Sequence, residues 1–320
     1  MRAIQKQFYA TIFRRYGPSS DQARAFVPPQ ERATARRAAA ALPAPTAEEA
    51  AVDDSLAALT EMSLAAERRS SEGGGGGDEA DRRRNATGAP VVIDTYMWQL
   101  RTARGDGNFS FTAAARQVDA LNAAYAPLGF RFNFVGVWFW VSDAWYGARD
   151  DSDAAAKMKA TLRRGAARAL NVWTGAPTSE IGELLGYATF PWDQAAAPKA
   201  DGVVIHHTTM PHAPGGASTF NPYAEGDTLV HEVGHWLGLY HTFQGGCSAT
   251  TGDYVADTPA QRTPTDGCPL SAWPDSCPTL PGKDPITSFM DYSYDACMDS
   301  FTPGQGARVR SFWAAYRHSK

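Results

Sequence analysis

The pattern of apolar and polar positions divides the chain near residue 90. Residues 28–90 are rich in Ala, Arg, Glu and Pro, contain a glycine run at 73–77 and carry almost no aromatic residues. Such a composition buries too little apolar surface to offset the entropy of ordering the chain. From Val91 onward, aromatic and β-branched residues become frequent. We therefore expect residues 1–90 to form a flexible extension and residues 91–320 to form the folded domain.

Helical and strand periodicities alternate within this domain. Residues 112–125 carry apolar side chains at helical spacing, with Thr112 as a candidate N-cap. Residues 130–137 begin with phenylalanines that alternate with polar residues, which is typical of a strand. We also expect helices over 153–170 and 303–317, and strands over 171–174 and 202–207. This alternation predicts an α/β (α+β) sandwich, in which helices pack on a mixed sheet.

Overall composition narrows the class of protein. The chain has 320 residues, of which 43% are hydrophobic, and a formal net charge of −4. It therefore lacks the broad basic character of nucleic-acid-binding proteins, and we expect no nucleic acid as a partner. No apolar run reaches the roughly 20 residues that cross a bilayer, so we also expect no membrane span.

One segment, LVHEVGHWLGLYHTF at 229–243, holds three of the seven histidines. His231 and His235 lie four residues apart, so on a helix both imidazoles point to one side. Gly238 can end that helix in the left-handed conformation, and the chain can then bring His241 back from outside it. An amphipathic helix with histidines on its polar side is the simpler alternative. The long HExxHxxGxxH pattern favours a zinc site instead.

The same segment predicts catalysis. Three protein ligands leave one zinc position for water, which distinguishes catalytic from structural zinc. Glu232 follows the first ligand directly, so its carboxylate should lie beside the ion rather than on it. As a general base, it can take the proton of the zinc-bound water while that water attacks a peptide carbonyl. We therefore predict a zinc-dependent endopeptidase, monomeric and acting on proteins or peptides.

Several segments resemble the pappalysin-type metzincins, particularly the secreted microbial and fungal metalloproteases of that family. They are HEVGHWLGLYH, SFMDYSYDAC, LGYATFP, DGVVI, HTFQGGC, GDYVADTPA and FTPGQ. The resemblance covers approximately residues 91–312 and fails over the first 90. It implies a metzincin-like catalytic domain, with a mixed twisted sheet, a backing helix, an active-site helix and an irregular, disulfide-linked C-terminal subdomain.

The resemblance also implies roles for single residues. Met290 would be the Met-turn methionine beneath the zinc histidines, and Tyr292 would stabilise the tetrahedral oxyanion. Ordinary core packing is the alternative for both. The segment DGVVIHH, which begins with DGVVI, resembles the edge strand along which metzincins bind an extended substrate. From its position and charge, we also expect Asp295 to favour Arg or Lys in the pocket after the scissile bond.

The cysteines predict the compartment. All four lie after the zinc helix and none forms a CxxC pair: Cys247, Cys268, Cys277 and Cys297. An even number favours two disulfides and an oxidising environment over free cytosolic thiols. Three connectivities are open to four cysteines, and the resemblance implies Cys247 with Cys277 and Cys268 with Cys297. We expect secretion or a secretory lumen, although the first residues lack the features of a signal peptide.

Other polar residues give weaker predictions. Asp253 and Asp257 offer oxygen ligands of the kind that calcium prefers, and some relatives hold calcium in this loop. Turn capping by aspartate explains them equally well. The remaining histidines of the sequence interior are expected to lie outside the zinc site: His206, His207 and His212.

The extension ends in a basic cluster, Arg82, Arg83 and Arg84, just before the folded part. Exposed polar segments of this kind are preferred sites of proteolysis. We expect a removable pro-segment, and the alternative is a solvated linker. Because the extension lacks cysteine, a carboxylate could fill the fourth zinc position: Asp78, Glu79 or Asp81. Two glycosylation sequons follow, Asn85-Ala86-Thr87 and Asn108-Phe109-Ser110.

Two rival interpretations of the domain remain. A catalytically inactive zinc-binding or adhesive module would have no need of Glu232 and Tyr292. A protease of another metzincin group fits less well with the cysteine spacing and with the HTFQGGC segment.

Overall fold

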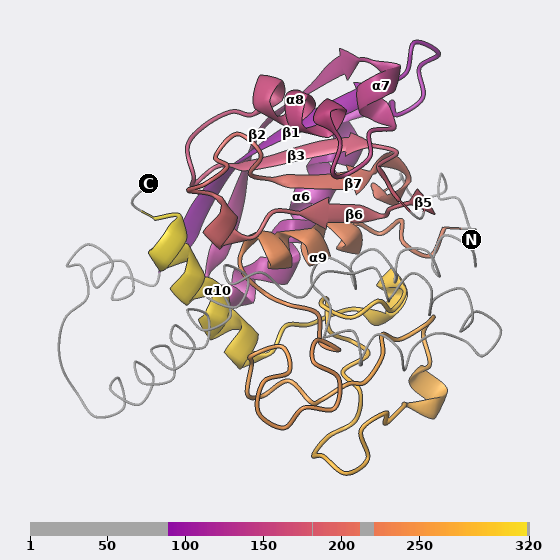
Figure 1. The fold of residues 1–320 in the computed structure, drawn as a ribbon, viewed down its shortest axis with the longest axis vertical. Helices are drawn as coiled ribbons and strands as arrows, with labels where there is room; N and C mark the ends of the chain where they lie inside the picture. Colours follow the sequence, from indigo (N-terminus) through magenta and orange to yellow (C-terminus); the bar gives the residue numbers. More distant parts are fainter. Residues whose placement is uncertain (1–88, 181, 212–220, 319–320) are drawn as a thin grey trace, which may run out of the picture.

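The computed structural model describes residues 89–180, 182–211 and 221–318, which are built around a five-stranded sheet (Figure 1). Its strand order is β2-β1-β3-β7-β6. Four neighbouring strands are parallel, namely β2 (Phe130–Val141), β1 (Val91–Arg101), β3 (Leu170–Gly175) and β7 (Val203–His206). The edge strand β6 (Gly186–Ala188) runs antiparallel to β7, which makes the sheet mixed. A small antiparallel hairpin is formed by β4 (Thr178–Ser179) and β5 (Gly182–Glu183).

Helices cover both faces of the sheet. Helices α6 (Phe111–Tyr125) and α9 (Asp227–Trp236) lie on one face, and α8 (Asp153–Leu162) lies on the other with the short α7 (Asp143–Tyr146) (Figure 1). The terminal helix α10 (Pro303–Tyr316) packs against two short 3-10 helices, η1 (Ala126–Leu128) and η2 (Pro191–Asp193). Three more such helices are η3 (His207–Thr209), η4 (Leu270–Ala272) and η5 (Asp295–Cys297).

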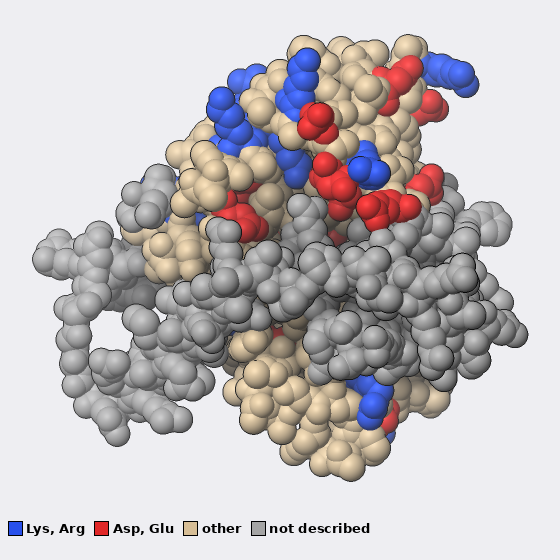
Figure 2. Space-filling model, in the orientation of Figure 1, with Lys and Arg blue, Asp and Glu red and all other residues tan. Residues whose placement is uncertain are grey.

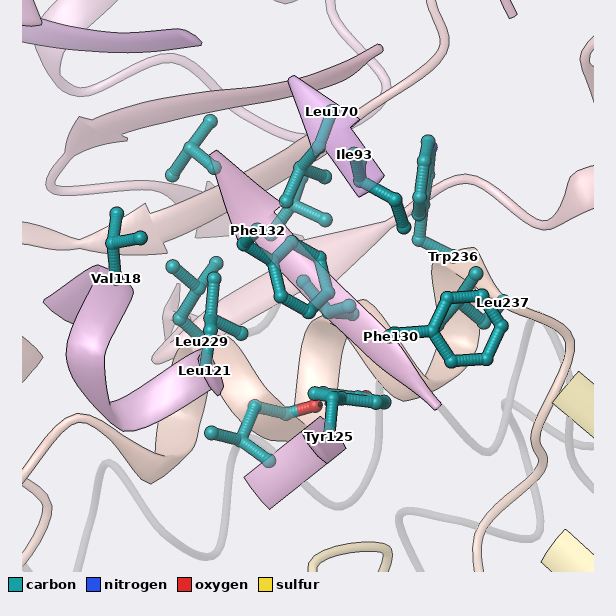
Figure 3. Packing of buried hydrophobic residues seen from close by; sticks show 14 of the residues in the cluster. Ile93, Val118, Leu121, Tyr125, Phe130, Phe132, Leu170, Leu229, Trp236 and Leu237 are labelled. Atoms are coloured by element: carbon teal, nitrogen blue, oxygen red, sulfur yellow. Dashed lines mark hydrogen bonds between the residues drawn. The ribbon is translucent and has the colours of Figure 1, made fainter. Parts of the chain in front are cut away.

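Alternate strand residues supply two cores, because successive side chains of a strand point to opposite faces. The larger core lies between the sheet and the helix pair α6 and α9 (Figure 3). It contains Ile93, Phe130, Phe132, Leu170, Val118, Leu121 and Leu229. The smaller core lies under α8 and contains Trp98, Leu100, Trp173, Val204, Met158 and Leu162. The predicted α/β class with helices on a mixed sheet is therefore confirmed.

Three local predictions need correction. Ser110, not Thr112, caps α6, because its Oγ accepts a hydrogen bond from the amide of Ala113 at 3.1 Å. The helix expected over 153–170 ends at Leu162, and Arg163 then turns away to bind Asp201. The segment DGVVI is not an edge strand. It forms β7, which is paired on both sides, so β6 provides the open edge next to it.

The chain between α9 and α10 has little regular structure and contains both disulfides. Cys247 is bonded to Cys277 and Cys268 to Cys297, each with a Cα–Cα distance of 5.5 Å. This is the pairing that the family resemblance implies. No helix in the described ranges is sufficiently long and apolar to cross a membrane. Figure 2 shows basic and acidic side chains close together on the described part of one face, in keeping with the small net charge.

A buried ion pair joins the end of α10 to Asp201, just before β7, and lies beside the C-terminal end of α9. The Arg317 guanidinium is fully buried and makes two contacts with the Asp201 carboxylate, at 3.0 and 3.1 Å. It also donates to the backbone oxygen of Trp236 at 2.9 Å, while the Trp236 indole donates to Asp201 at 3.1 Å. Because removing one partner of a buried ion pair leaves an uncompensated charge, this contact fixes the end of the predicted zinc helix.

Candidate active site

Helix α9 presents the first two predicted zinc ligands and is held at its start by Asp295. One carboxylate oxygen of Asp295, Oδ2, accepts hydrogen bonds from the amides of Glu225, Gly226 and Asp227 at 2.9, 3.2 and 3.3 Å. Amides at a helix start lack partners within the helix, so a buried carboxylate satisfies them. The other oxygen, Oδ1, is buried without a hydrogen-bond partner among the described residues.

The end of α9 turns at Gly238, as the sequence predicts. Gly238 has a φ of +102°, and a Cβ there would lie 2.8 Å from the ring of Phe312. Beyond this turn, Leu239 donates its amide to the oxygen of Gly234 at 2.9 Å. The chain then reverses direction and brings His241 back to the helix.

The three predicted histidines converge. Their Nε2 atoms are 3.0 to 3.1 Å apart, and all three side chains are buried. The Nδ1 atoms of His231 and His235 lie 2.7 Å from the backbone oxygens of Phe289 and Leu239. A carbonyl only accepts, so each Nδ1 donates and each Nε2 of a neutral ring carries a lone pair. Among the described residues, only this group of at least three His, Cys, Asp or Glu could hold a metal ion.

This donor set fits zinc. Burial lowers the pKa of His231 and His241 well below the usual value and that of His235 to about 4, so the rings are neutral. The Nε2 lone pairs of His231 and His235 face each other and repel unless a cation lies between them. Neutral imidazole nitrogens are preferred zinc ligands, and the carbonyls that receive the Nδ1 protons orient two of the three rings.

His241 reaches this point from the loop after α9 and is placed by aromatic contacts. Its ring stacks on Phe243, with centroids 4.7 Å apart and planes within 7°. The Tyr292 hydroxyl lies 3.1 Å from His241 Nε2. The Tyr292 side chain is 7% exposed, so its hydroxyl faces the three nitrogens from a mostly buried position. The structure therefore brings Tyr292 to the site that the resemblance implies.

Met290 is fully buried beneath α9. A Cβ built on Gly234 would lie 2.4 Å from the Met290 sulfur, so only glycine allows this approach. Met290 also accepts a backbone hydrogen bond from Thr242 at 3.1 Å. The sequence pattern does not predict this role of Gly234, although the glycine stands inside the HEVGH motif.

Glu232 lies beside the histidines and against the open edge of the sheet. Its side chain is buried, and its Oε1 has no hydrogen-bond partner among the described residues. Burial raises the pKa of this carboxyl to about 8 in the protein without metal. A Cβ built on Gly186 of β6 would lie 2.8 Å from Glu232 Cγ. The sequence did not predict this role of Gly186. The only indication is that Gly186 is the glycine of the LGYATFP segment.

The remaining predicted residues lie elsewhere. Asp257 accepts hydrogen bonds from Thr302 Oγ1 at 2.7 Å and from the amide of Gly304 at 2.8 Å, at the start of α10. Asp253 Oδ1 accepts from the amide of Val255 at 3.0 Å. These contacts support the capping alternative, and the described residues give calcium no support.

Three further histidines are described and lie outside the zinc group, namely His206, His207 and His318. His206 ends β7 and His207 begins η3. Burial and the neighbouring His207 lower the pKa of His206 to about 4. His212, the Arg82–Arg84 cluster, the three acidic residues before it and the sequon at Asn85 fall outside the described residues.

Comparisons with known proteins identify the family. Residues 215–314 match the peptidase M43 model, described as pregnancy-associated plasma protein-A. An extracellular metalloprotease of Neurospora crassa is 44% identical over 219 residues, which cover 68% of this chain and 72% of the relative. The chain belongs to the pappalysin family of metalloproteases. The predicted family and the predicted metalloendopeptidase activity are thereby confirmed.

Comparison with solved structures supports the same family assignment. Mature mirolysin of Tannerella forsythia, in complex with a cleaved peptide, matches this pappalysin with a TM-score of 0.57 and 28% identity, over 70% of this chain and 92% of that chain. Promirolysin of the same organism matches with a TM-score of 0.57 and 26% identity, over 74% and 86%. The extracellular naming of the curated relatives and the two disulfides are consistent with secretion.

Proposed function

We propose that this pappalysin is a secreted endopeptidase in which His231, His235 and His241 hold one zinc ion and Glu232 is the general base. The convergence of three neutral Nε2 atoms beside a buried, unpaired carboxylate oxygen carries this proposal. When bound, zinc supplies a Lewis acid that polarises the scissile carbonyl and activates water. The protein's own residues then provide proton transfer, charge stabilisation and substrate alignment.

Glu232 moves the proton. Its Oε1 accepts no hydrogen bond from the described residues, so it is available to a water molecule. The carboxylate takes a proton from the attacking water and passes it to the departing amine, which leaves the carboxylate ready for another cycle. No covalent intermediate with the protein is needed.

Tyr292 stabilises the negative charge that develops on the carbonyl oxygen. Its hydroxyl is 3.1 Å from His241 Nε2 and so faces the region where that oxygen would lie. A hydroxyl held before the reaction begins can donate to the oxyanion without reorganisation.

The open edge of β6 aligns the substrate. Edge strands carry unpaired backbone groups that can pair with an extended peptide. Since Gly186 of β6 lies directly against Glu232, a peptide on this edge passes the general base.

The unpaired Asp295 Oδ1 supports a preference for Arg or Lys after the scissile bond, because a cationic side chain would satisfy this buried oxygen.

The roles of Glu232 and the histidines are tested with Glu232→Gln. This variant keeps one zinc per chain and loses about 10² to 10⁴ in kcat, because the base is not a ligand. Zinc is measured by elemental analysis, and hydrolysis with a quenched-fluorescence peptide. Glu225→Gln, at an exposed glutamate near the start of α9, is the matched control and retains both. Loss of zinc in Glu232→Gln with retention in His241→Ala would overturn the assignment.

A further inference from the structure

A buried polar cluster lies behind the third histidine and is not used in the proposed hydrolysis. It consists of four residues that are at most 6% exposed: Thr242, Gln261, Thr265 and Asp291. Thr242 directly follows His241 in the chain, and Asp291 stands between Met290 and Tyr292. The cluster therefore touches both segments that complete the site from outside α9.

Gln261 is the centre of this cluster. Its Oε1 accepts from the Thr242 hydroxyl at 2.6 Å, and its Nε2 donates to Asp291 Oδ2 at 3.0 Å. Thr265 donates its amide to Asp291 Oδ1 at 3.0 Å and its hydroxyl to Asp291 Oδ2. A backbone hydrogen bond of 3.1 Å from Thr242 to Met290 closes the ring. The ring therefore ties the loop of His241 to the loop of Tyr292, directly through the Thr242–Met290 bond and indirectly through Gln261.

The composition of the ring requires an explanation beyond packing. Burial raises the pKa of the Asp291 carboxyl, and the hydrogen bonds from Thr265, Gln261 and the Tyr292 amide oppose that effect. A buried carboxylate costs free energy that an apolar contact would avoid. A satisfied polar network, however, permits only one arrangement of the segments that it joins. Such a fixed arrangement suits His241 and Tyr292, because the ring nitrogen of one and the hydroxyl of the other must lie together at the zinc site.

We propose that Gln261 and Asp291 are positioning residues, which hold His241 and Tyr292 in one fixed relation at the zinc site. His231 and His235 are placed by α9 and by their carbonyl partners, whereas His241 and Tyr292 come from separate loops. The Gln261–Asp291 pair is the side-chain link between those loops. This inference rests on the roles proposed above for His241 and Tyr292.

A reciprocal exchange tests the pair. Asp291→Asn turns an amide toward the Gln261 amide, and Gln261→Glu turns a carboxylate toward Asp291, so each single change breaks the ring. When both are combined, the amide at position 291 donates to the carboxylate at position 261, which still accepts from Thr242. The amide of Thr265 keeps the side-chain oxygen at position 291 as its acceptor, and the hydroxyl of Thr265 gains the carboxylate at position 261. The combined variant therefore restores the pattern of donors and acceptors without restoring either residue.

The measurements are kcat and KM of the full chain, the rate of zinc release to a chelator, and the visible spectrum of the cobalt-substituted protein. Each single variant loses about 10- to 100-fold in kcat with little change in KM, releases zinc faster and shows an altered cobalt spectrum. The combined variant recovers all three. Asp284→Asn is the matched control, since Asp284 is also buried and hydrogen-bonded but binds Ser276. It lowers thermal stability and leaves kcat and spectrum unchanged.

Two results would overturn the proposal: single variants that lose only thermal stability, or an exchange that recovers stability but neither kcat nor the cobalt spectrum. Tyr292→Phe separates this failure from failure of the proposed function. If Tyr292→Phe keeps full kcat, the oxyanion role is wrong, while zinc release and the cobalt spectrum still report whether the pair positions His241.

Discussion

At the scale of single residues, glycines determine how closely the elements of the active site approach. Gly234 lets the sulfur of Met290 lie under α9, and Gly186 lets β6 lie against Glu232. Both positions would otherwise carry a Cβ at less than van der Waals distance from a site residue. These glycines therefore matter for catalysis, although neither offers a functional group.

We predict that Gly186→Ala displaces the Glu232 side chain, because the new methyl would lie 2.8 Å from Cγ and 3.0 Å from the backbone oxygen of Val204. The expected result is a loss of about 10²-fold in kcat, with zinc still bound. Gly147→Ala is the control, since a Cβ there meets nothing within 4 Å. Equal peptide hydrolysis by the two variants would contradict the contact.

The residues that the sequence predicted best are those linked by local spacing. His231, His235, Gly238 and His241 depend on helix periodicity and one turn, which are legible within eleven positions. Gly186 and Gln261 act through contacts with distant segments, and no local pattern reports them. Asp295 was noticed for its charge, but its bonds to the start of α9 depend on a loop some 70 residues away along the chain.

At the scale of elements, α9 is stabilised from outside at both ends. Asp295 holds its start, and the Asp201–Arg317 pair holds its end. Tertiary contacts also explain the boundaries that periodicity missed. Beyond Leu162, where helix α8 ends, Arg163 leaves the helical conformation, with a ψ of 137°, and its side chain binds Asp201. The DGVVI strand is enclosed because the antiparallel strand β6 pairs with its second side. Neither partner is adjacent in sequence.

The start of α9 predicts a pH effect on stability. Burial, with the Asp295 and Glu225 charges, raises the pKa of Asp227 to about 8. The folded state then binds a proton that the unfolded state releases near pH 4. The stabilisation is complete below that pH and is lost as the pH rises toward 8.

We therefore expect the unfolding free energy of the chelated protein, relative to Asp227→Asn, to fall between pH 5 and about 8. Denaturant titrations of both proteins measure this difference, in which the histidine contributions cancel. Parallel curves over that range would show that Asp227 is ionised in the folded state.

At the scale of the whole molecule, the extension remains a proposal. Its composition and basic cluster favour a removable pro-segment over residues 1–90, ahead of a catalytic domain at 91–320, and the name of promirolysin shows that a relative has a pro-form. Periodicity does not reveal such a role, because inhibition depends on where a segment binds and not on its own pattern.

We predict that a chain beginning at Asn85 hydrolyses a test peptide faster, per bound zinc, than the full chain. Cleavage after Arg84 should coincide with activation, because the segment before it would no longer be attached to the domain. Full-length protein with Arg82, Arg83 and Arg84 changed to alanine is the control and should stay slow. Equal rates for the full and shortened chains would leave the extension as a linker.

The buried Arg317–Asp201 contact also bears on the order of biosynthesis. The ribosome synthesises His231, His235 and His241 well before Arg317. A nascent chain can therefore carry every metal ligand while the end of α9 still lacks its partner. Packing of the zinc helix is then completed only when the last turn of α10 has emerged. Folding of the active site therefore depends on a contact that can form only after all of its metal ligands have been synthesised.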